Sequence, residues 1–323
     1  MARILRHYGT LFGMVAIVVV FWVLLPDTFM TARNWLNITQ QLSMLTVVAV
    51  AMTVVMVIGD FDLSVGSMAS LAGVFAAVLF TLGWPVWAAV VAALALGLVG
   101  GVINGVLVSM IGILPFVATL ATLTMYSGVA FIVSGGKTIF GRDIPQSFGD
   151  FAKSGLPLGT LADKPIVLPW LTVLALGIAA LIAVVLELTT YGRRLYAIGG
   201  NAEAARLAGV KVAFLRLTAY AFTGVGAAAA GLMYASRVAS ANPTQGEGLM
   251  LNAIAAVFLG MTITRHGQPR VLATLAGVLV LGVMDNGLTQ LKVDSYVRQV
   301  LVGLIILLAV SISALGRRAI LRR

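Results

Sequence analysis

The stretch VWAAVVAALALGLVGGVINGVLVSM, residues 86–110, decides the fold class of this protein. No charged side chain interrupts it, and most of its residues are Val, Leu, Ala and Gly. At about 1.5 Å of rise per residue, a helix of this length exceeds the roughly 30 Å hydrocarbon core of a bilayer. The stretch therefore predicts a helix that spans a membrane.

The composition of the whole chain agrees with a protein that lies mostly in a membrane. Of the 323 residues, 60% are hydrophobic and only 10% are charged, whereas soluble domains average about 45–50% and about 25%. This composition excludes an ordinary soluble domain. It also excludes a disordered chain, which needs few apolar residues and many charges.

Nine further apolar runs bring the expected number of spanning helices to about ten. They cover residues 11–25, 42–58, 65–82, 116–133, 170–188, 213–234, 249–261, 271–288 and 297–315. The run 249–261 is short for a full span, and we expect a broken or re-entrant helix there. The fold class that follows is all-α and polytopic, with residues 1–323 forming a single transmembrane domain.

Three glycines in the run 86–110, at positions 97, 101 and 105, recur every four residues and share one helix face. Such a face lets the backbone of a second helix approach closely. Ordinary helix packing and a role in a moving interface both fit this pattern.

Basic residues set the expected orientation. If the N-terminus is inside the cell, most of the 21 Lys and Arg residues fall in inner segments, as is typical of cytoplasmic loops. An even number of spans then places both termini and the loop 189–212 in the cytoplasm, and the long polar loop 134–168 outside. The same rule accounts for the net charge of +10 without nucleic acid, since no basic patch with interleaved aromatic residues occurs.

Several kinds of chemistry have no support in the sequence. The chain has no Cys and only two His, His7 and His266, so we expect no metal site. Residues 136–138, Gly-Lys-Thr, resemble the end of a phosphate-binding loop, but Phe131 stands where that pattern needs Gly. We therefore expect no cofactor and no enzymatic activity in this chain, and an energy source that lies outside it.

The segment 191–210, YGRRLYAIGGNAEAARLAGV, is the most informative polar stretch. Gly199 and Gly200 allow a sharp turn, and Asn201 is a good N-cap for a helix whose first turn holds Glu203. Gly209 is suited to end that helix. The segment is either a simple connector or a compact helix that fits a groove of a partner.

At this point the sequence resembles a family. Residues 203–209, Glu-Ala-Ala-x-x-x-Gly, match the signature of the permease subunits of ATP-binding cassette (ABC) importers. Other segments resemble the ribose-type, simple-sugar branch of that family in unbroken order: 62–67, 104–105, 115–120, 192–193, 197–201 and 253–257. The residues at 250, 252, 260–261 and 264–267 depart from the family pattern, so the resemblance leaves the sugar open.

The resemblance implies an inner-membrane permease in a bacterial sugar uptake system. Its implied partners are an ABC ATPase subunit, a periplasmic sugar-binding protein and a second permease subunit, identical or related. The helix at 203–209 would then couple the permease to the ATPase. The residues implied in this coupling are Gly192, Arg193, Gly199, Gly200, Asn201, Glu203, Ala204, Ala205 and Gly209.

A second group of residues consists of polar and aromatic side chains in or near the apolar runs. Asp60 and Asp62 must face water, a cavity or a partner, and we expect Asp62 to cap the helix that follows. The segment 59–64 lies on the inner side or dips into the membrane. The candidates for a pathway or gate are Asp60, Asp62, Ser64, Asn104, Asn252, Phe258, Asp285 and Asn286.

Two other functions stay open on the sequence alone. The aspartates near the apolar runs fit a secondary transporter that an ion gradient drives. An integral membrane enzyme would need clustered His, Cys or paired acids, and Asp60 with Asp62 is the one close acidic pair.

Overall fold

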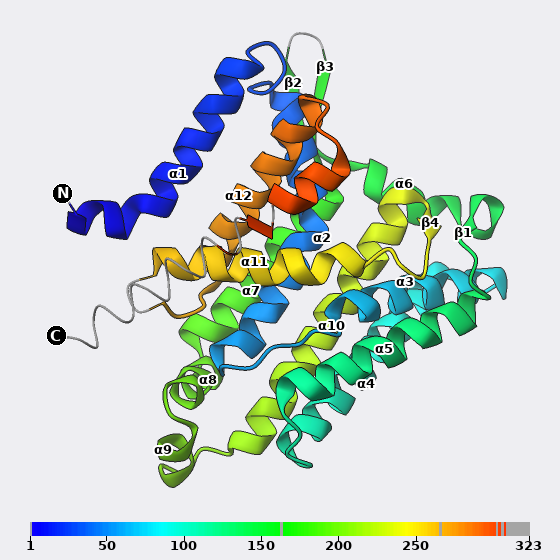
Figure 1. The fold of residues 1–323 in the computed structure, drawn as a ribbon. Helices are drawn as coiled ribbons and strands as arrows, with labels where there is room; N and C mark the ends of the chain where they lie inside the picture. Colours follow the sequence, from blue (N-terminus) through cyan, green and yellow to red (C-terminus); the bar gives the residue numbers. More distant parts are fainter. Residues whose placement is uncertain (1, 162–163, 265–266, 302, 305–306, 308–323) are drawn as a thin grey trace.

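The computed structural model describes residues 2–161, 164–264, 267–301, 303–304 and 307 (Figure 1). Helices form the body of the molecule, and the described residues also contain two small antiparallel strand pairs. Six helices in the described part of the chain are long and apolar enough to cross a membrane, and three shorter apolar helical stretches accompany them. The all-α, polytopic fold class is thus confirmed.

Nine of the expected spans correspond to helices, of which the first two begin nine and ten residues earlier than expected. The nine helices are α1 (Ala2–Leu24), α2 (Ala32–Val57), α3 (Val65–Thr81), α4 (Val86–Ser109), α5 (Pro115–Ser134), α7 (Trp170–Leu188), α10 (Val212–Val238), α11 (Glu247–Ile263) and α12 (Val271–Gln290). Of the tenth, residues 295–301 are helical, and the remainder lies mostly outside the described residues. The count of ten and the cytoplasmic position of both termini stay predictions.

Helix α2 begins ten residues before the expected span, at Ala32 rather than 42. The first turns of α2 are polar and lie outside the apolar run 42–58, but their side chains form hydrogen bonds with other elements. The Asn34 amide donates to Asn286 at 3.1 Å, and the Gln40 amide donates to the Ala152 carbonyl at 2.7 Å. Because other helices surround α2, most of its apolar residues are buried.

Helix α11 is one continuous helix, so the expected break in it is wrong. It contains 17 residues, which corresponds to about 25 Å of length. It packs tightly on α12, because a Cβ on Gly277 would meet the Ala256 backbone, and a Cβ on Gly260 would meet that of Ala273. Close packing against α12 supports the helix even though its sequence is short for a span.

The glycine face of α4 packs on α10, as its spacing predicts. A Cβ added to Gly97 would lie 2.6 Å from the Gly224 carbonyl oxygen, and one on Gly105 would lie 2.8 Å from Leu217 Cα. The two backbones are too close for any side chain larger than hydrogen at these points. This contact fixes α4 against the helix that follows the loop 189–212.

The two ends of the molecule differ (Figure 1). One end carries α8 (Thr190–Gly200) and α9 (Ala202–Leu207), and we call this pair the docking unit. The opposite end carries α6 (Gln146–Lys153) and the hairpin of β2 (Gly155–Leu161) with β3 (Lys164–Pro169). The same end has β1 (Ile139–Phe140), which pairs with β4 (Ser240–Ala241), and the short helix η1 (Gly141–Asp143). The segment expected as a long loop is therefore partly ordered into short elements.

Candidate functional site: the docking unit and the interior loop

Helix α9 is capped at both ends as its sequence predicts. The Asn201 side-chain oxygen accepts the Ala204 N–H at 3.0 Å, which satisfies one free donor of the first turn. At the other end Gly209 has a φ of +81°, a conformation that favours glycine. The N–H of Val210 then donates to the Ala205 carbonyl. The result is a single compact helix between two sharp changes of chain direction.

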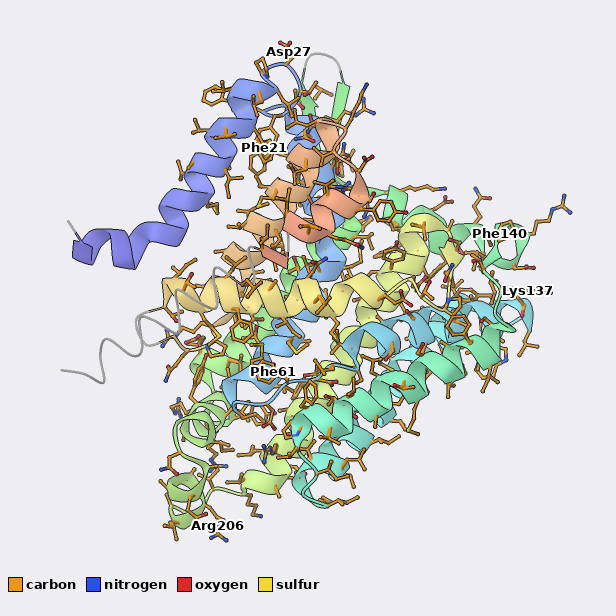
Figure 2. All side chains as sticks on the ribbon, in the orientation of Figure 1. Phe21, Asp27, Phe61, Lys137, Phe140 and Arg206 are labelled. Carbon is orange, nitrogen blue, oxygen red and sulfur yellow. The ribbon has the colours of Figure 1, made fainter. Side chains whose placement is uncertain are left out.

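Almost the whole surface of α9 is exposed. Ala205 is its one buried residue, whereas Ala204 and Glu203 are exposed and the Leu207 side chain is 79% exposed. Figure 2 shows Arg206 at the far tip of the molecule. A small-residue face with a large apolar side chain beside it, outside the apolar helices, is suited to contact another protein.

The one acid of α9 is held by a base on the same helix. The Arg206 guanidinium donates to Glu203 through Nε at 3.1 Å and Nη2 at 2.6 Å. These hydrogen bonds, together with the charge of Arg206, lower the pKa of Glu203. The carboxylate is therefore negative throughout the physiological range and offers a fixed charge to a partner.

Helix α8 attaches the docking unit to the spanning helices. Gly192 is buried against the last turn of α7, where a Cβ would overlap the Leu186 carbonyl, and Leu195 and Ile198 are buried in the core. The expected sharp turn at Gly199 and Gly200 is wrong, because both lie within α8 and the chain bends at Asn201. Gly199 is needed for a close approach, since its Cβ would overlap the carbonyl oxygen of Val57. Arg193, on the same helix, is exposed.

The contact between Gly199 and Val57 leads directly to residues 58–64, which we call the interior loop. It connects α2 to α3 and holds Asp60 and Asp62, which are both buried. Figure 2 labels Phe61 in this loop, near the middle of the molecule. The segment therefore lies among the helices, and its expected position on the inner side or within the membrane stays a prediction.

Asp62 is the centre of a buried polar cluster. Its carboxylate accepts the Ser64 N–H at 2.9 Å and the Ser64 hydroxyl at 2.6 Å. The Asn104 amide donates to Ser64 Oγ at 2.8 Å and lies 3.4 Å from both Asp62 oxygens, and the Thr122 hydroxyl donates to Asn104 at 2.7 Å. Asn104 and Thr122 lie about 7 and 10 Å from the ends of α4 and α5 nearest the docking unit. The cluster therefore lies among the spanning helices, inward from their ends.

The expected capping role of Asp62 needs correction. Helix α3 begins at Val65 with Ser64 as its N-cap residue, so Asp62 lies before the cap. Its side chain instead bonds two residues onward, which is the Asx turn that a short carboxylate forms readily. Asp62 therefore shapes the loop that leads into the helix rather than the first turn itself.

Asp60 forms a separate pair with α10. The Arg216 guanidinium donates to both Asp60 oxygens at 2.5 Å. The Tyr220 hydroxyl, one turn further along α10, donates to the Phe61 carbonyl at 3.3 Å. The Phe61 ring packs against Phe258 of α11, with 6.0 Å between ring centroids. The interior loop is thus bound directly to α4, α10 and α11, and through Asn104 to Thr122 of α5.

A feature that the sequence interpretation missed is the meeting of two helix starts. The N–H of Gly246, just before α11, donates to the Ser70 hydroxyl of α3 at 2.8 Å, and a Cβ on Gly66 would lie 2.6 Å from the Gly246 carbonyl oxygen. The Gln245 amide donates to Gly231, which lies about 10 Å before the end of α10. The signal was present in the turn-forming residues 242–246, Asn-Pro-Thr-Gln-Gly. Helix starts inside a membrane domain are typical of transporter binding sites.

The remaining candidates do not join the cluster. Asn252 is half-buried on α11. Asp285 is exposed and pairs with Arg298 at 2.8 Å, and Asn286 accepts from Asn34 and from Gln290 near the far end of α12. Asp62, Ser64 and Asn104 are therefore the three that the structure brings together, with Asp60 and Phe258 beside them.

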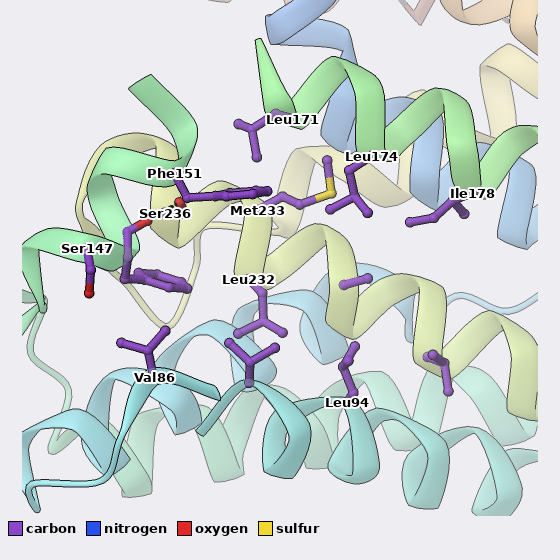
Figure 3. Close-up of a pocket in the computed structure, with 14 residues that line it drawn as sticks. Val86, Leu94, Ser147, Phe151, Leu171, Leu174, Ile178, Leu232, Met233 and Ser236 are labelled. Atoms are coloured by element: carbon purple, nitrogen blue, oxygen red, sulfur yellow. Dashed lines mark hydrogen bonds between the residues drawn. The ribbon is translucent and has the colours of Figure 1, made fainter. Parts of the chain in front are cut away.

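One cavity among the described residues has the wrong chemistry for a polar solute. It has a volume of about 560 Å³ and lies between α4, α6, α7 and α10 (Figure 3). Its lining is apolar except for Ser147 and Ser236, and the Ser236 hydroxyl already donates to the Phe148 carbonyl. A sugar hydroxyl buried there would lose its hydrogen bonds to water and gain almost none. Among the described residues, no group of three or more metal-ligating side chains occurs either.

Comparison with known proteins identifies the family to which these features belong. The sequence model of the family described as "Branched-chain amino acid transport system / permease component" matches residues 34–310. The chain belongs to this permease family. Six apolar helices and this membership make the permease a multi-pass inner-membrane protein.

Several relatives match the permease over nearly its full length. The ribose import permease protein of Escherichia coli strain K12 is 37% identical over 309 residues, which cover 95% of this chain and 93% of the relative. The L-arabinose transport system permease protein of the same strain is 35% identical over 95% of this chain and 90% of the relative. The D-allose transport system permease protein is 31% identical, over 95% and 91%. No solved structure matches the chain.

Proposed function

We propose that this permease carries a simple sugar or a sugar alcohol across the bacterial inner membrane as part of an ABC importer. The printed functions of the relatives, for ribose, L-arabinose and D-allose, support this substrate class. The polar groups of the interior cluster are two hydroxyls, an amide and the Asp62 carboxylate, all of which can hydrogen-bond a solute rich in hydroxyl groups.

The observation that carries the proposal is the exposed, doubly capped helix α9 on an otherwise apolar protein. A separate ABC ATPase subunit would bind this helix and hydrolyse the ATP, and a periplasmic sugar-binding protein would deliver the solute at the opposite end. A second permease subunit would complete the pathway. The docking unit would then face the cytoplasm and the β2–β3 hairpin the periplasm.

The route of coupling follows from the contacts of the docking unit. A push on α9 would pass to α8, whose Gly199 lies directly against Val57 at the end of α2. The next residues form the interior loop, which contacts α4, α10 and α11 directly. The loop would change its place between states in which the pathway opens to one side and then to the other.

The decisive experiment compares uptake of radiolabelled sugars into liposomes that hold the permease with and without its ATPase subunit. We expect uptake only when ATPase, internal ATP and binding protein are all present, and no change when ion gradients are dissipated. Uptake by the permease alone under a proton or sodium gradient would instead establish the secondary transporter. Thermal-shift screening of the binding protein would identify the sugar.

A further inference from the structure

A second cavity lies at the joint between the docking unit and the membrane helices. It has a volume of about 370 Å³ and is formed by the start of α8, by Gly209 after α9 and by the start of α10. The lining side chains that matter here are Thr190, Tyr191, Arg194, Lys211 and Phe214.

The charge of the cavity is positive. Arg194 and Lys211 both line it, and no acidic side chain does. Within the described part of the chain, neither cation forms an ion pair, and the nearby acids are engaged elsewhere: Glu203 with Arg206, Glu187 with Arg270 and Asp60 with Arg216. Thr190 and Tyr191 also line it, and the Tyr191 hydroxyl is hydrogen-bonded to Thr218 at 3.0 Å. The cavity therefore favours an anion that accepts several hydrogen bonds.

The position of the cavity indicates what kind of anion this is. Phe214 is the third residue of the spanning helix α10, and its ring is 60% exposed. It lies within about 5 Å of the helix start. At the interface of a membrane, an apolar side chain in this position can contact acyl chains while the neighbouring cations contact headgroups. A ligand that fits is anionic at one end and apolar at the other.

We propose that this cavity binds the phosphate headgroup of an anionic phospholipid, with Arg194 and Lys211 on the phosphate and an acyl chain along Phe214. Basic pockets between membrane helices are suited to such headgroups, and each cation near the surface contributes about a kilocalorie per mole. A lipid held there ties α8 to α10, so it stiffens the joint through which α9 moves.

The test is lipid binding by the purified permease, measured by native mass spectrometry and by thermal shift. We expect phosphatidylglycerol to be retained and to stabilise the protein more than phosphatidylcholine or inorganic phosphate at equal concentration. The double variant Arg194→Gln/Lys211→Gln should bind phosphatidylglycerol about thirty-fold more weakly, which follows from the loss of two such cations. The matched control is Arg142→Gln/Lys153→Gln, which removes the same charge from exposed positions at the opposite end.

Each contrary result overturns the proposal in a distinct way. Equal phosphatidylglycerol binding by both double variants would show that the cavity is not the site. Equal stabilisation by inorganic phosphate would make it a phosphate site without a lipid. Unchanged lipid binding with weakened ATPase association would assign the two cations to the protein interface instead. If the double variant does not fold, Lys211→Gln alone should show about a five-fold loss.

Discussion

The docking unit and the interior loop contain the same contact in opposite surroundings. Each has an arginine that bonds both oxygens of a carboxylate. In the docking unit the Glu203 and Arg206 side chains are 63% and 67% exposed, whereas in the interior loop Asp60 is 4% exposed. The exposed pair joins neighbours on one helix, and the buried pair joins residues 156 positions apart.

The difference in exposure between the two ion pairs indicates the role of each region. An exposed pair contributes little to folding because water screens it, so its charges remain free to meet a partner. A buried carboxylate needs its counter-charge, because the low dielectric makes an unpaired charge costly. Charge substitutions in the docking unit should therefore leave folding nearly unchanged but weaken coupling. Charge substitutions in the interior loop should mainly weaken folding.

The largest expected effect on stability comes from Arg216→Met, which leaves Asp60 buried without a partner. We expect a loss of about 3–5 kcal/mol in the free energy of unfolding, measured by thermal or denaturant unfolding in detergent. The double variant Asp60→Asn/Arg216→Met should recover much of that loss, since it removes the uncompensated charge. A double variant as unstable as the single one would contradict a cost that comes from unpaired charge.

The next effect concerns the polar cluster. Asp62→Ala removes the acceptor for the Ser64 backbone and hydroxyl and leaves the Asn104 amide with fewer partners. We expect a loss of about 1.5–3 kcal/mol. The matched control is Asp285→Ala, whose exposed pair with Arg298 should be worth at most about 1 kcal/mol. Equal losses for both would mean that the Asp62 cluster stabilises nothing beyond a surface pair.

A smaller effect on stability, with a large effect on transport, is expected for Gly209→Val. The φ of +81° at Gly209 is unfavourable for a β-branched residue, at a local cost of about 1–3 kcal/mol. The helix α9 should lose its fixed end, so ATP-driven uptake should fall strongly while the amount of permease in the membrane stays normal. Gly177→Val, in the middle of α7 where a Cβ meets nothing, should leave uptake intact. Normal uptake by the Gly209 variant would remove the coupling role of α9.

The smallest effect on folding should come from Glu203→Lys, because this side chain is 63% exposed. Unfolding should not change measurably, but ATPase binding and uptake should drop. The pKa of Glu203 lies below its ordinary value of 4.5, so the carboxylate stays ionised between about pH 6 and 8. Docking of the wild type should therefore not vary with this group in that range. Docking that weakens on acidification within that range would point to another titrating group.

Local features of both regions were predictable to different degrees. Asn201 and Gly209 act over a few residues, and their roles as helix start and helix end followed from side-chain and backbone preferences. The turn expected at Gly199 and Gly200 is wrong, because glycine occurs both in turns and where two backbones approach closely. Here it allows α8 to approach Val57 without leaving the helix, and the sequence cannot distinguish a turn from a close contact.

The interior contacts needed the folded chain. Asp62, Ser64 and Asn104 were all candidates, but nothing in their spacing joins them to each other or to Thr122. The same holds for Asp60 and Arg216, and for Gly246 with Ser70. Each of these pairs links different helices, and the number of possible helix arrangements is too large for a pattern along one chain to select among them.

Apolar runs, charges and capping residues were enough to predict that this protein lies in a membrane, where most of its helices run, and that a short capped helix lies outside them. These properties depend on apolar length, charge and local hydrogen bonding, which neighbouring residues decide. The tertiary structure decided which polar groups share the interior, because a buried charge or amide must find its partner in space. That partner comes from whichever helix the packing of small residues brings near.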